Sequence, residues 1–437
     1  VQTLEALGGR VKPYIPDRVE EGYGLNVGAL RDLAAEGVSL IVTVDCGIRA
    51  WEEIAAANEL GLDVVITDHH EPRDHVPEAV AIIDPKWTSV GVHRTGMERG
   101  EALAGVGVAY RLAQALLRMH RRDPVHDGGP TLEEETLLDL VALGTVADIV
   151  PLRGQNRTLV RRGLERLNAM DRPGIRALCR QVGVKPGEIN ARTIGFVLGP
   201  RLNAAGRLSQ AQTAFRLLTT SDPAEAQTLA VALDGLNRER QRLTREAHQR
   251  ARQLVQETIG DGMMLFAASP EFSLGIVGLV ASRLLDEYYR PAVVVSIGPE
   301  ISRGSCRSVD GFDITGALDQ CRDLLVRHGG HAAAAGFRVR TGDLKVLEDR
   351  LRAIAAESLA GQDLRPILEA DAEAPLSQMT WDLLEAIESL EPYGSGNEQP
   401  VFVSRGVVVR DRRAVGRDRR HLKLTLSDGR KTWDAIA

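Results

Sequence analysis

Three short apolar runs, each with an aspartate at or near its end, constrain the fold of this chain more than any other feature. The runs are VSLIVTVD over 38–45, LDVVITDHH over 62–70 and a shorter one from Val80 to Asp84. A helical pattern over 50–60 lies between the first two. Apolar strands that alternate with helices indicate a parallel sheet with both faces covered. Because ligands of such sheets bind beyond the carboxyl ends of the strands, we expect a site at this edge.

Polar side chains that can bind a metal ion occupy those strand ends. They are Asp45, Asp68, His69, His70 and Asp84, and Asp148 follows a further apolar run over 131–147. At a strand tip one histidine can reach a metal ion while its neighbours orient it. Carboxylate and imidazole ligands together suit manganese, zinc or iron, and magnesium where oxygen ligands dominate. A lone DHH tripeptide is more often an ordinary polar surface, but the accompanying Asp45 and Asp148 favour a metal site.

A long helical pattern and a switch to short alternating strands near the C-terminus divide the chain into domains. The pattern over 222–258 begins with Ser-Asp-Pro and has apolar residues at helical spacing, which predicts one long connecting helix. Short alternating strands near the C-terminus are typical of a small β-barrel. We therefore predict an α/β protein with a parallel-sheet domain, a connecting helix, a second α/β domain and the start of an OB-like β-barrel. The predicted boundaries are 1–221, 222–260, 261–362 and 363–437.

The predicted second α/β domain carries two segments rich in small residues. Strand patterns over 263–268 and 291–298 flank a helical pattern over 275–289. We expect a Gly/Ser/Arg loop over 302–308 after them. Further on, Gly329, Gly330 and His331 open a Gly/Ala segment in which small side chains let a phosphate approach the backbone closely.

The composition excludes several classes of protein. No run of about 18 apolar residues is present, so we expect no transmembrane helix and no membrane partner. The opening residues lack the pattern of a signal peptide. The four cysteines have no metal-binding spacing and are too few for a disulfide scaffold, which favours a reducing cytoplasm.

Charge indicates a nucleic-acid partner only locally. The formal net charge is −6, so the chain as a whole is not basic. A basic stripe nevertheless lies between Arg405 and Lys423, where only Asp411 and Asp418 oppose it. Its members are Arg410, Arg412, Arg413, Arg417, Arg419, Arg420 and His421. Such clustering predicts phosphate contact better than the total charge does.

Several motifs, taken in order, resemble a known family. VTVDCGI (42–48), TDHH (67–70), LGTVADIVPL (143–152), PRLNAAGRL (200–208) and GGHAAAAG (329–336) are similar to motifs of the DHH phosphoesterase superfamily. PYIPDRVEEGYGLN (13–26) and LEPYGSGNEQPVF (390–402) narrow the resemblance to RecJ-type exonucleases specific for single strands. The resemblance covers nearly the whole chain.

The resemblance implies a 5′→3′ exonuclease that hydrolyses single-stranded DNA with two manganese or magnesium ions. It assigns Asp45, His69 and Asp148 as metal ligands, and Asp68 and His70 as residues that support them. One ion would activate a water, and both would stabilise charge on the attacking and leaving oxygens. These residues and His331 are the candidate catalytic residues.

The resemblance also implies how the DNA is held. Arg18, Ser305 and Arg307 match a pocket for the 5′-phosphate, which forked guanidinium groups and a hydroxyl suit chemically. The candidate nucleic-acid contacts are Asn203, Arg207, Gly329, Gly330, His331, Arg412, Arg413, Arg419 and Arg420. Structural alternatives stay open for several of them. These are an ion pair from Arg18 to Glu20 or Glu21, a solvated loop position for Arg307, a buried hydrogen-bonded His331, and a capping role for Asn203 and Arg207.

One departure from the family pattern concerns the first strand. RecJ-like proteins carry an Asp-Tyr-Asp-Ala-Asp-Gly motif there, which supplies ligands to both ions, and this sequence contains no such segment. In the family the motif lies just upstream of the position of Val1. We therefore expect an N-terminally truncated fragment of an active parent, itself weak or inactive as a nuclease.

Two other functions remain open from the sequence. One is a short-oligonucleotide or cyclic-dinucleotide phosphodiesterase, against which the barrel-like C-terminal segment argues. The other is a non-catalytic scaffold that binds single strands, against which the metal-binding residues argue. The resemblance further implies work with helicases and single-strand-binding protein in DNA repair and recombination.

Overall fold

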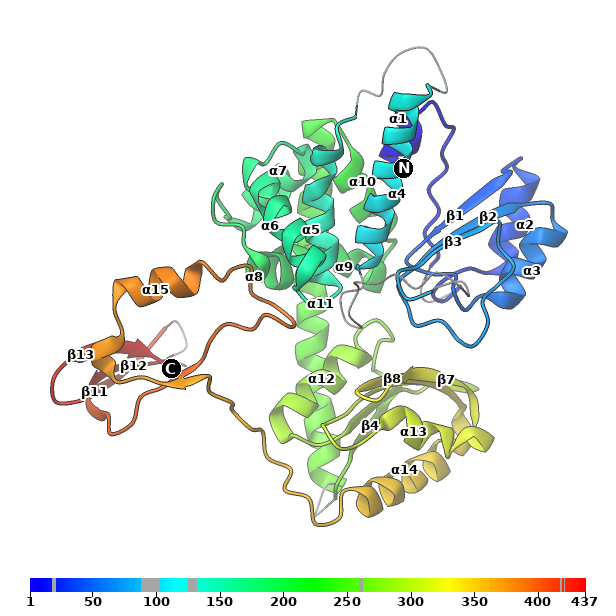
Figure 1. Cartoon of the computed structure of the whole chain (residues 1–437). Coiled ribbons are helices and arrows are strands. Elements are labelled where there is room, and N and C mark those ends of the chain that lie inside the picture. The colour runs from blue at the N-terminus through cyan, green and yellow to red at the C-terminus, as the bar shows by residue number, and fades with distance from the viewer. Residues whose placement is uncertain (18–20, 88–102, 125–131, 259–261, 417–418, 420) are drawn as a thin grey trace.

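Two α/β lobes joined by one long helix, and a small β domain at the C-terminus, make up the structure (Figure 1). The computed structural model describes residues 1–17, 21–87, 103–124, 132–258, 262–416, 419 and 421–437. Within these ranges, no helix is both long and apolar enough to cross a membrane. The predicted α/β architecture, with its parallel sheet and long connecting helix, is confirmed.

A parallel sheet of three strands, in the order β1-β2-β3, forms the edge of the first lobe. Its strands are β1 (Leu40–Val44), β2 (Asp63–Thr67) and β3 (Ala81–Ile83). The helices before and between them are α1 (Gln2–Ala6), α2 (Val27–Ala35) and α3 (Trp51–Glu59). Leu30 of α2 and Ile54 of α3 pack with Val64 and Ile66 in one apolar cluster. Because the strands are parallel, the residues that follow each strand meet at one edge of the sheet.

Helices complete the first lobe. They bury a second apolar cluster, which includes Leu143, Leu178, Ile194 and Leu233. The elements are α4 (Gly105–Arg122), η1 (Glu134–Leu137), α5 (Leu138–Ala147), α6 (Gly154–Ala169), α7 (Pro173–Val182), α8 (Ala191–Thr193), η2 (Ile194–Leu198), α9 (Gly199–Leu208) and α10 (Gln212–Thr219). The long helix α11 (Pro223–Thr258) then runs from this lobe into the next (Figure 1).

The second lobe has a mixed sheet of five strands in the order β4-β5-β6-β8-β7. Its strands are β4 (Leu265–Ser269), β5 (Ala292–Ser296), β6 (Ile301–Arg307), β7 (Leu325–His331) and β8 (Ala334–Arg340). Its helices are α12 (Val277–Tyr288), α13 (Ile314–Asp319), η3 (Arg322–Leu324), η4 (Thr341–Asp343) and α14 (Leu344–Ser358).

The prediction of a loop over 302–308 is wrong, because most of that segment forms the central strand β6. Burial alternates along it, with Ser302 and Cys306 fully buried between more exposed neighbours. Gly304 faces Phe337 so closely that a Cβ there would lie 2.2 Å from the ring. The small residues that suggested a loop are therefore required by packing within the sheet.

Short strands and one helix form the C-terminal domain. They are β9 (Ala372–Glu373), η5 (Leu376–Gln378), α15 (Trp381–Glu388), β10 (Phe402–Val403), β11 (Val408–Val415), β12 (His421–Ser427) and β13 (Thr432–Ile436). The last three strands make an antiparallel sheet. Trp433 Nε1 donates to the carbonyl oxygen of Leu376 at 3.1 Å and so ties that sheet to the preceding segment.

Candidate metal centre and nucleic-acid interface

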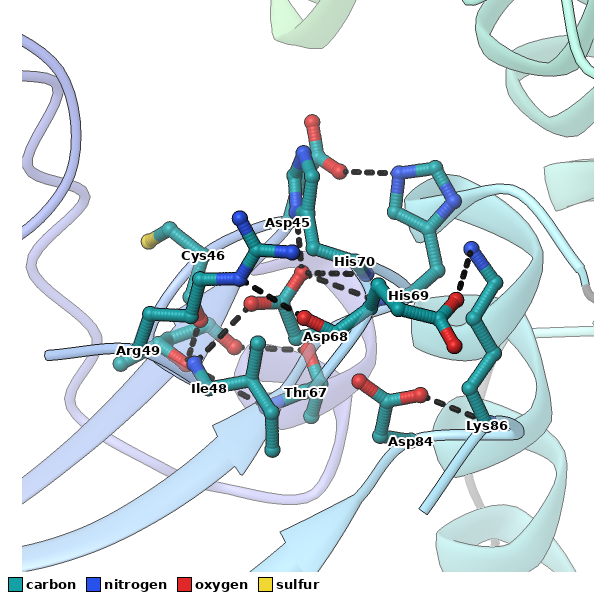
Figure 2. Close-up of polar contacts among 12 residues, drawn as sticks. Asp45, Cys46, Ile48, Arg49, Thr67, Asp68, His69, His70, Asp84 and Lys86 are labelled. Atoms are coloured by element: carbon teal, nitrogen blue, oxygen red, sulfur yellow. Dashed lines mark hydrogen bonds and ion pairs between the residues drawn. The ribbon is translucent and has the colours of Figure 1, made fainter. Parts of the chain in front are cut away.

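Asp45, His69 and Asp148 converge at the carboxyl edge of the first sheet. Asp45 follows β1, His69 follows β2, and Asp148 caps the C-terminus of α5. His69 Nε2 lies 2.9 Å from Asp45 Oδ1 and 3.4 Å from Asp148 Oδ2. The fold thus brings together all three residues that the resemblance assigned as metal ligands. Figure 2 shows two of them, Asp45 and His69.

Asp68 is buried beneath these residues and organises them. One of its oxygens, Oδ1, accepts hydrogen bonds from the backbone amides of His69 and His70, and Oδ2 accepts one from Ile48. Its Oδ1 also lies 2.6 Å from His70 Nδ1. Burial raises the pKa of Asp68, but the hydrogen bonds from His70 and the backbone outweigh burial, so the pKa lies below its ordinary value. The same hydrogen bond raises the pKa of His70.

His70 lies closer to the centre than a purely supporting role requires. Ligand atoms of Asp45, His69 and His70 all lie within 4.8 Å of one another. Because Asp68 lies 2.6 Å from Nδ1 of His70, Nε2 is the ring nitrogen that can bind a cation. The geometry therefore adds His70 to the candidate ligands.

Asp45 is held in a strained backbone conformation beside a glycine. Its φ is +63°, a region that costs a non-glycine residue about 1–3 kcal/mol. The Tyr23 hydroxyl donates to the Asp45 carbonyl oxygen at 2.5 Å. Gly105, at the start of α4, lies so close that a Cβ there would be 2.4 Å from Asp45 Oδ1. The motif residue Tyr23 and the glycine Gly105 were not predicted as site residues, although both stand in Gly-rich stretches of the sequence.

The residues present fit a divalent cation. Asp45 Oδ1 is buried, and Nε2 of His69 lies 2.9 Å from it. Burial raises the pKa of Asp148, and the neighbouring Asp45 carboxylate adds to that rise while His69 opposes it. One carboxylate and two imidazoles lie within 4.8 Å of one another, with the Asp148 carboxylate 3.4 Å from His69. Carboxylate and imidazole ligands suit Mn²⁺ and, with more oxygen ligands, Mg²⁺.

Asp84 provides a test of the electrostatics at this edge. Its side chain follows β3 and is 7% exposed, and its Oδ2 has no hydrogen-bond partner. Burial raises its pKa from 3.8 to about 6, against the opposing hydrogen bond from the Lys86 amide. In the folded state Asp84 therefore stays protonated at pH values where the unfolded chain ionises it. The protonated Asp84 therefore contributes to the free energy of unfolding below pH 4, and this contribution is lost as the pH rises through about 6.

We expect Asp84→Asn to remove this loss. In EDTA at pH 7, the variant should be more stable than the wild type by about 2 kcal/mol. At pH 4 the two should be nearly equally stable. Urea unfolding at both pH values measures the difference, and an equal free energy of unfolding at pH 7 would contradict the buried-charge argument.

The structure describes two of the three candidate residues of the 5′-phosphate pocket, Ser305 and Arg307. Arg18 lies outside the described residues. Ser305 and Arg307 lie two positions apart on β6, so they share one face of the strand. Arg307 Nη1 donates to Ser305 Oγ at 3.3 Å, and burial lowers the pKa of Arg307. A Cβ at Gly278, in the first turn of α12, would lie 3.1 Å from Ser305 Oγ, so this helix closes the face.

The small-residue segment forms a hairpin on the second lobe. Gly329, Gly330 and His331 end β7, and all three are exposed. A Cβ at Gly330 would lie 2.3 Å from the carbonyl oxygen of Ala334, so only glycine fits there. The exposure of His331 excludes the alternative of a buried structural histidine.

Asn203 and Arg207 lie on α9 at the junction of the lobes. Asn203 is exposed. Arg207 Nη1 donates to the carbonyl oxygen of Gly275 at 3.3 Å, and a Cβ at Gly275 would lie 2.2 Å from the Arg207 carbonyl oxygen. Arg207 therefore has a structural contact between the lobes.

The basic stripe of the C-terminal domain is exposed where it is described. Arg412 and Arg413 lie on β11, and Arg419 lies in the turn before β12. Arg420 lies outside the described residues. Lys423, opposite Arg413 on β12, is paired with Asp434 at 2.7 Å.

Similarity to known proteins identifies the family of this chain. Three family models match it: "DHH family, N-terminal domain" over residues 1–145, "DHHA1 domain" over 261–357 and "RecJ OB domain" over 370–437. The chain is 40% identical to the single-stranded-DNA-specific exonuclease RecJ of Bacillus subtilis, over 100% of its own length and 53% of that relative. It is 36% identical to RecJ of Dickeya dadantii, over 100% of its length and 77% of the relative. The chain belongs to the RecJ family.

Solved RecJ structures have the same fold. RecJ of Thermus thermophilus in complex with Mn²⁺ matches 100% of this chain and 60% of its own, with a TM-score of 0.82 and 33% identity. An exonuclease RecJ bound to manganese matches 82% of this chain and 85% of its own, with a TM-score of 0.68 and 36% identity. The chain spans about half the length of the Bacillus relative.

Proposed function

We propose that the site at the edge of the first sheet serves 5′→3′ hydrolysis of single-stranded DNA with Mn²⁺ or Mg²⁺, and that this sequence, which contains no Asp-Tyr-Asp-Ala-Asp-Gly segment, is by itself weak or inactive. The observation that carries the proposal is the convergence of Asp45, His69 and His70 within 4.8 Å, with Asp148 3.4 Å from His69. Its relatives are named as single-stranded-DNA-specific exonucleases, and relatives of known structure were solved with Mn²⁺ bound.

The residues of the chain have distinct roles in this proposal. Asp45, His69 and Asp148, with His70, hold the ions, and Asp68 fixes the ring of His70. Bound divalent ions supply an activated water and stabilise charge on the attacking and leaving oxygens. Ser305 and Arg307, with Arg18, bind the terminal phosphate and so select the 5′ end. His331 contacts the scissile phosphate, and the glycines beside it let the strand approach the backbone.

The wider assignments are part of the same proposal. We place the domain boundaries at residues 221, 260 and 362. The cytoplasm is the proposed location, which four free cysteines support. Helicases and single-strand-binding protein are the proposed partners in repair and recombination.

A nuclease assay on the full-length protein tests the proposed function. In Mn²⁺, single-stranded oligonucleotides of tens of nucleotides should be degraded, and a 5′ label should be released before a 3′ label. Duplexes with blunt ends should persist. Activity restricted to di- or trinucleotides would instead indicate a short-oligonucleotide phosphodiesterase, and binding without cleavage would indicate a scaffold.

The C-terminal stripe should contribute affinity without sequence preference. We expect the double variant Arg412→Gln/Arg413→Gln to weaken single-strand binding equally for all sequences. The slope of log affinity against log salt should become shallower by about 0.7 for each arginine that contacts a phosphate. Fluorescence anisotropy at several salt concentrations measures both effects. Arg405→Gln is the matched control, because Arg405 is already paired with Glu373 at 2.9 Å. An unchanged salt slope in the double variant would contradict the role of the stripe.

A further inference from the structure

The segment from Leu390 to Asn397, within the motif LEPYGSGNEQPVF, contacts the loop that carries Asp148. This segment, called here the clamp, lies between α15 and β10 of the C-terminal domain. Figure 1 shows the chain after α15 running to the helices of the first lobe before it turns back to the last strands of that domain. The loop between α5 and α6 runs from Asp148 to Arg153.

Hydrogen bonds between residues more than 200 positions apart hold the clamp to this loop and to the start of α6. The Leu152 amide donates to the Ser395 carbonyl oxygen at 2.7 Å. Arg153 Nε donates to the Gly396 carbonyl oxygen at 2.5 Å. Arg157, one turn into α6, donates through Nη2 to the carbonyl oxygens of Leu390 and Glu391, at 2.6 and 3.3 Å. These contacts use the clamp backbone, so they depend on its shape more than on its side chains.

The clamp is itself internally fixed. Gly394 and Asn397 exchange backbone hydrogen bonds at 3.0 Å, and Asn397 Nδ2 donates to the carbonyl oxygens of Leu390 and Pro392. Gly396 has a φ of +70°, which favours glycine. A Cβ at Gly394 would lie 2.7 Å from Leu152 Cδ1, and Leu152 is only 2% exposed. The motif therefore specifies a rigid turn shaped to receive Leu152.

The loop transmits this contact to Asp148. Ile149, next to Asp148, has a φ of +59°, although its β-branched side chain disfavours that region and is 75% exposed. Such a conformation persists only where the surrounding structure holds it. The Ile149 side chain is exposed and has little packing. The backbone conformation of Ile149 is therefore held from the two ends of the loop, by α5 on one side and by the clamped Leu152 on the other.

We propose that the clamp is a positioning element that fixes the Asp148 carboxylate and thereby sets the metal affinity of the site. This inference rests on the proposed function of Asp148 as a metal ligand. It gives a role to the motif LEPYGSGNEQPVF, which the proposed phosphate binding and hydrolysis do not use. It also makes docking of the C-terminal domain onto the first lobe a requirement for a complete metal centre.

The test uses Arg157→Ala and Gly394→Ala in the full-length protein. Amide hydrogen exchange at Leu152 should become about 10-fold faster in both variants, because the bond to Ser395 loosens. Mn²⁺ binding, measured by calorimetry, should weaken by about 10-fold. The Mn²⁺ concentration for half-maximal cleavage should rise in parallel, while KM for the single strand stays unchanged. Arg157→Lys should recover part of the Mn²⁺ affinity, since it can still donate to the carbonyl oxygens.

Arg162→Ala is the matched control, because Arg162 lies on the same helix and pairs with Glu135 away from the clamp. It should leave both exchange at Leu152 and Mn²⁺ binding unchanged. Faster exchange with unchanged Mn²⁺ affinity would overturn the proposal that the clamp positions Asp148. A wild type that binds Mn²⁺ but does not cleave DNA would overturn the proposed function instead and leave the clamp supported by its effect on Mn²⁺ binding.

Discussion

Replacing His69 with alanine is expected to lower the rate of single-strand cleavage by about 10³-fold or more. Its Nε2 lies within 3.4 Å of both Asp45 and Asp148, so removing the ring takes away the residue around which the candidate ligands gather. Charge stabilisation by a bound ion is worth several kcal/mol, and each 1.36 kcal/mol is tenfold in rate. Single-turnover kinetics in saturating DNA, together with Mn²⁺ calorimetry, measures the loss.

His75→Ala is the control for the His69 variant. His75 lies in the loop after the same strand, but its ring packs against Trp51, with ring centroids 5.3 Å apart, and it is not in the group of possible metal ligands. It should retain cleavage and Mn²⁺ binding. Substantial cleavage by His69→Ala with normal Mn²⁺ dependence would show that the metal centre lies elsewhere.

The substitution Gly105→Ala should have the next largest effect. The new Cβ would lie 2.4 Å from Asp45 Oδ1 and 2.8 Å from its Cβ and Cγ, so the carboxylate must move. A displacement of about 1 Å in a reacting group costs about 10²-fold in rate. We therefore expect cleavage to fall by about 10²-fold and Mn²⁺ binding to weaken, while circular dichroism stays that of a folded protein.

A glycine with free space around it separates this effect from a general change in helix stability. Gly235 lies within α11, and a Cβ there meets nothing within 4 Å. Gly235→Ala should keep full activity and gain up to about 1 kcal/mol in stability, because alanine is the better helix former. Equal activity of the Gly105 and Gly235 variants would contradict the assignment of Asp45 to the metal centre.

The sequence alone predicted the grouping of the metal-site residues. Asp45 and the residues from Asp68 to His70 follow apolar strands separated by a helical pattern, and parallel strands place their carboxyl ends at one edge. Such patterns repeat over a few residues and report the local conformation directly. The long helix α11 was predicted for the same reason, since its apolar spacing persists over many turns.

The tertiary structure alone decided the features that depend on partners distant in the sequence. Segment 302–308 reads as a loop, yet most of it is strand β6, because its glycine accommodates Phe337 of the neighbouring strand. That strand geometry places Ser305 and Arg307 on one face. Gly105 gains its importance only from Asp45, and the clamp only from a loop more than 200 residues earlier. Local periodicity carries no information on such contacts, because packing between distant segments creates them.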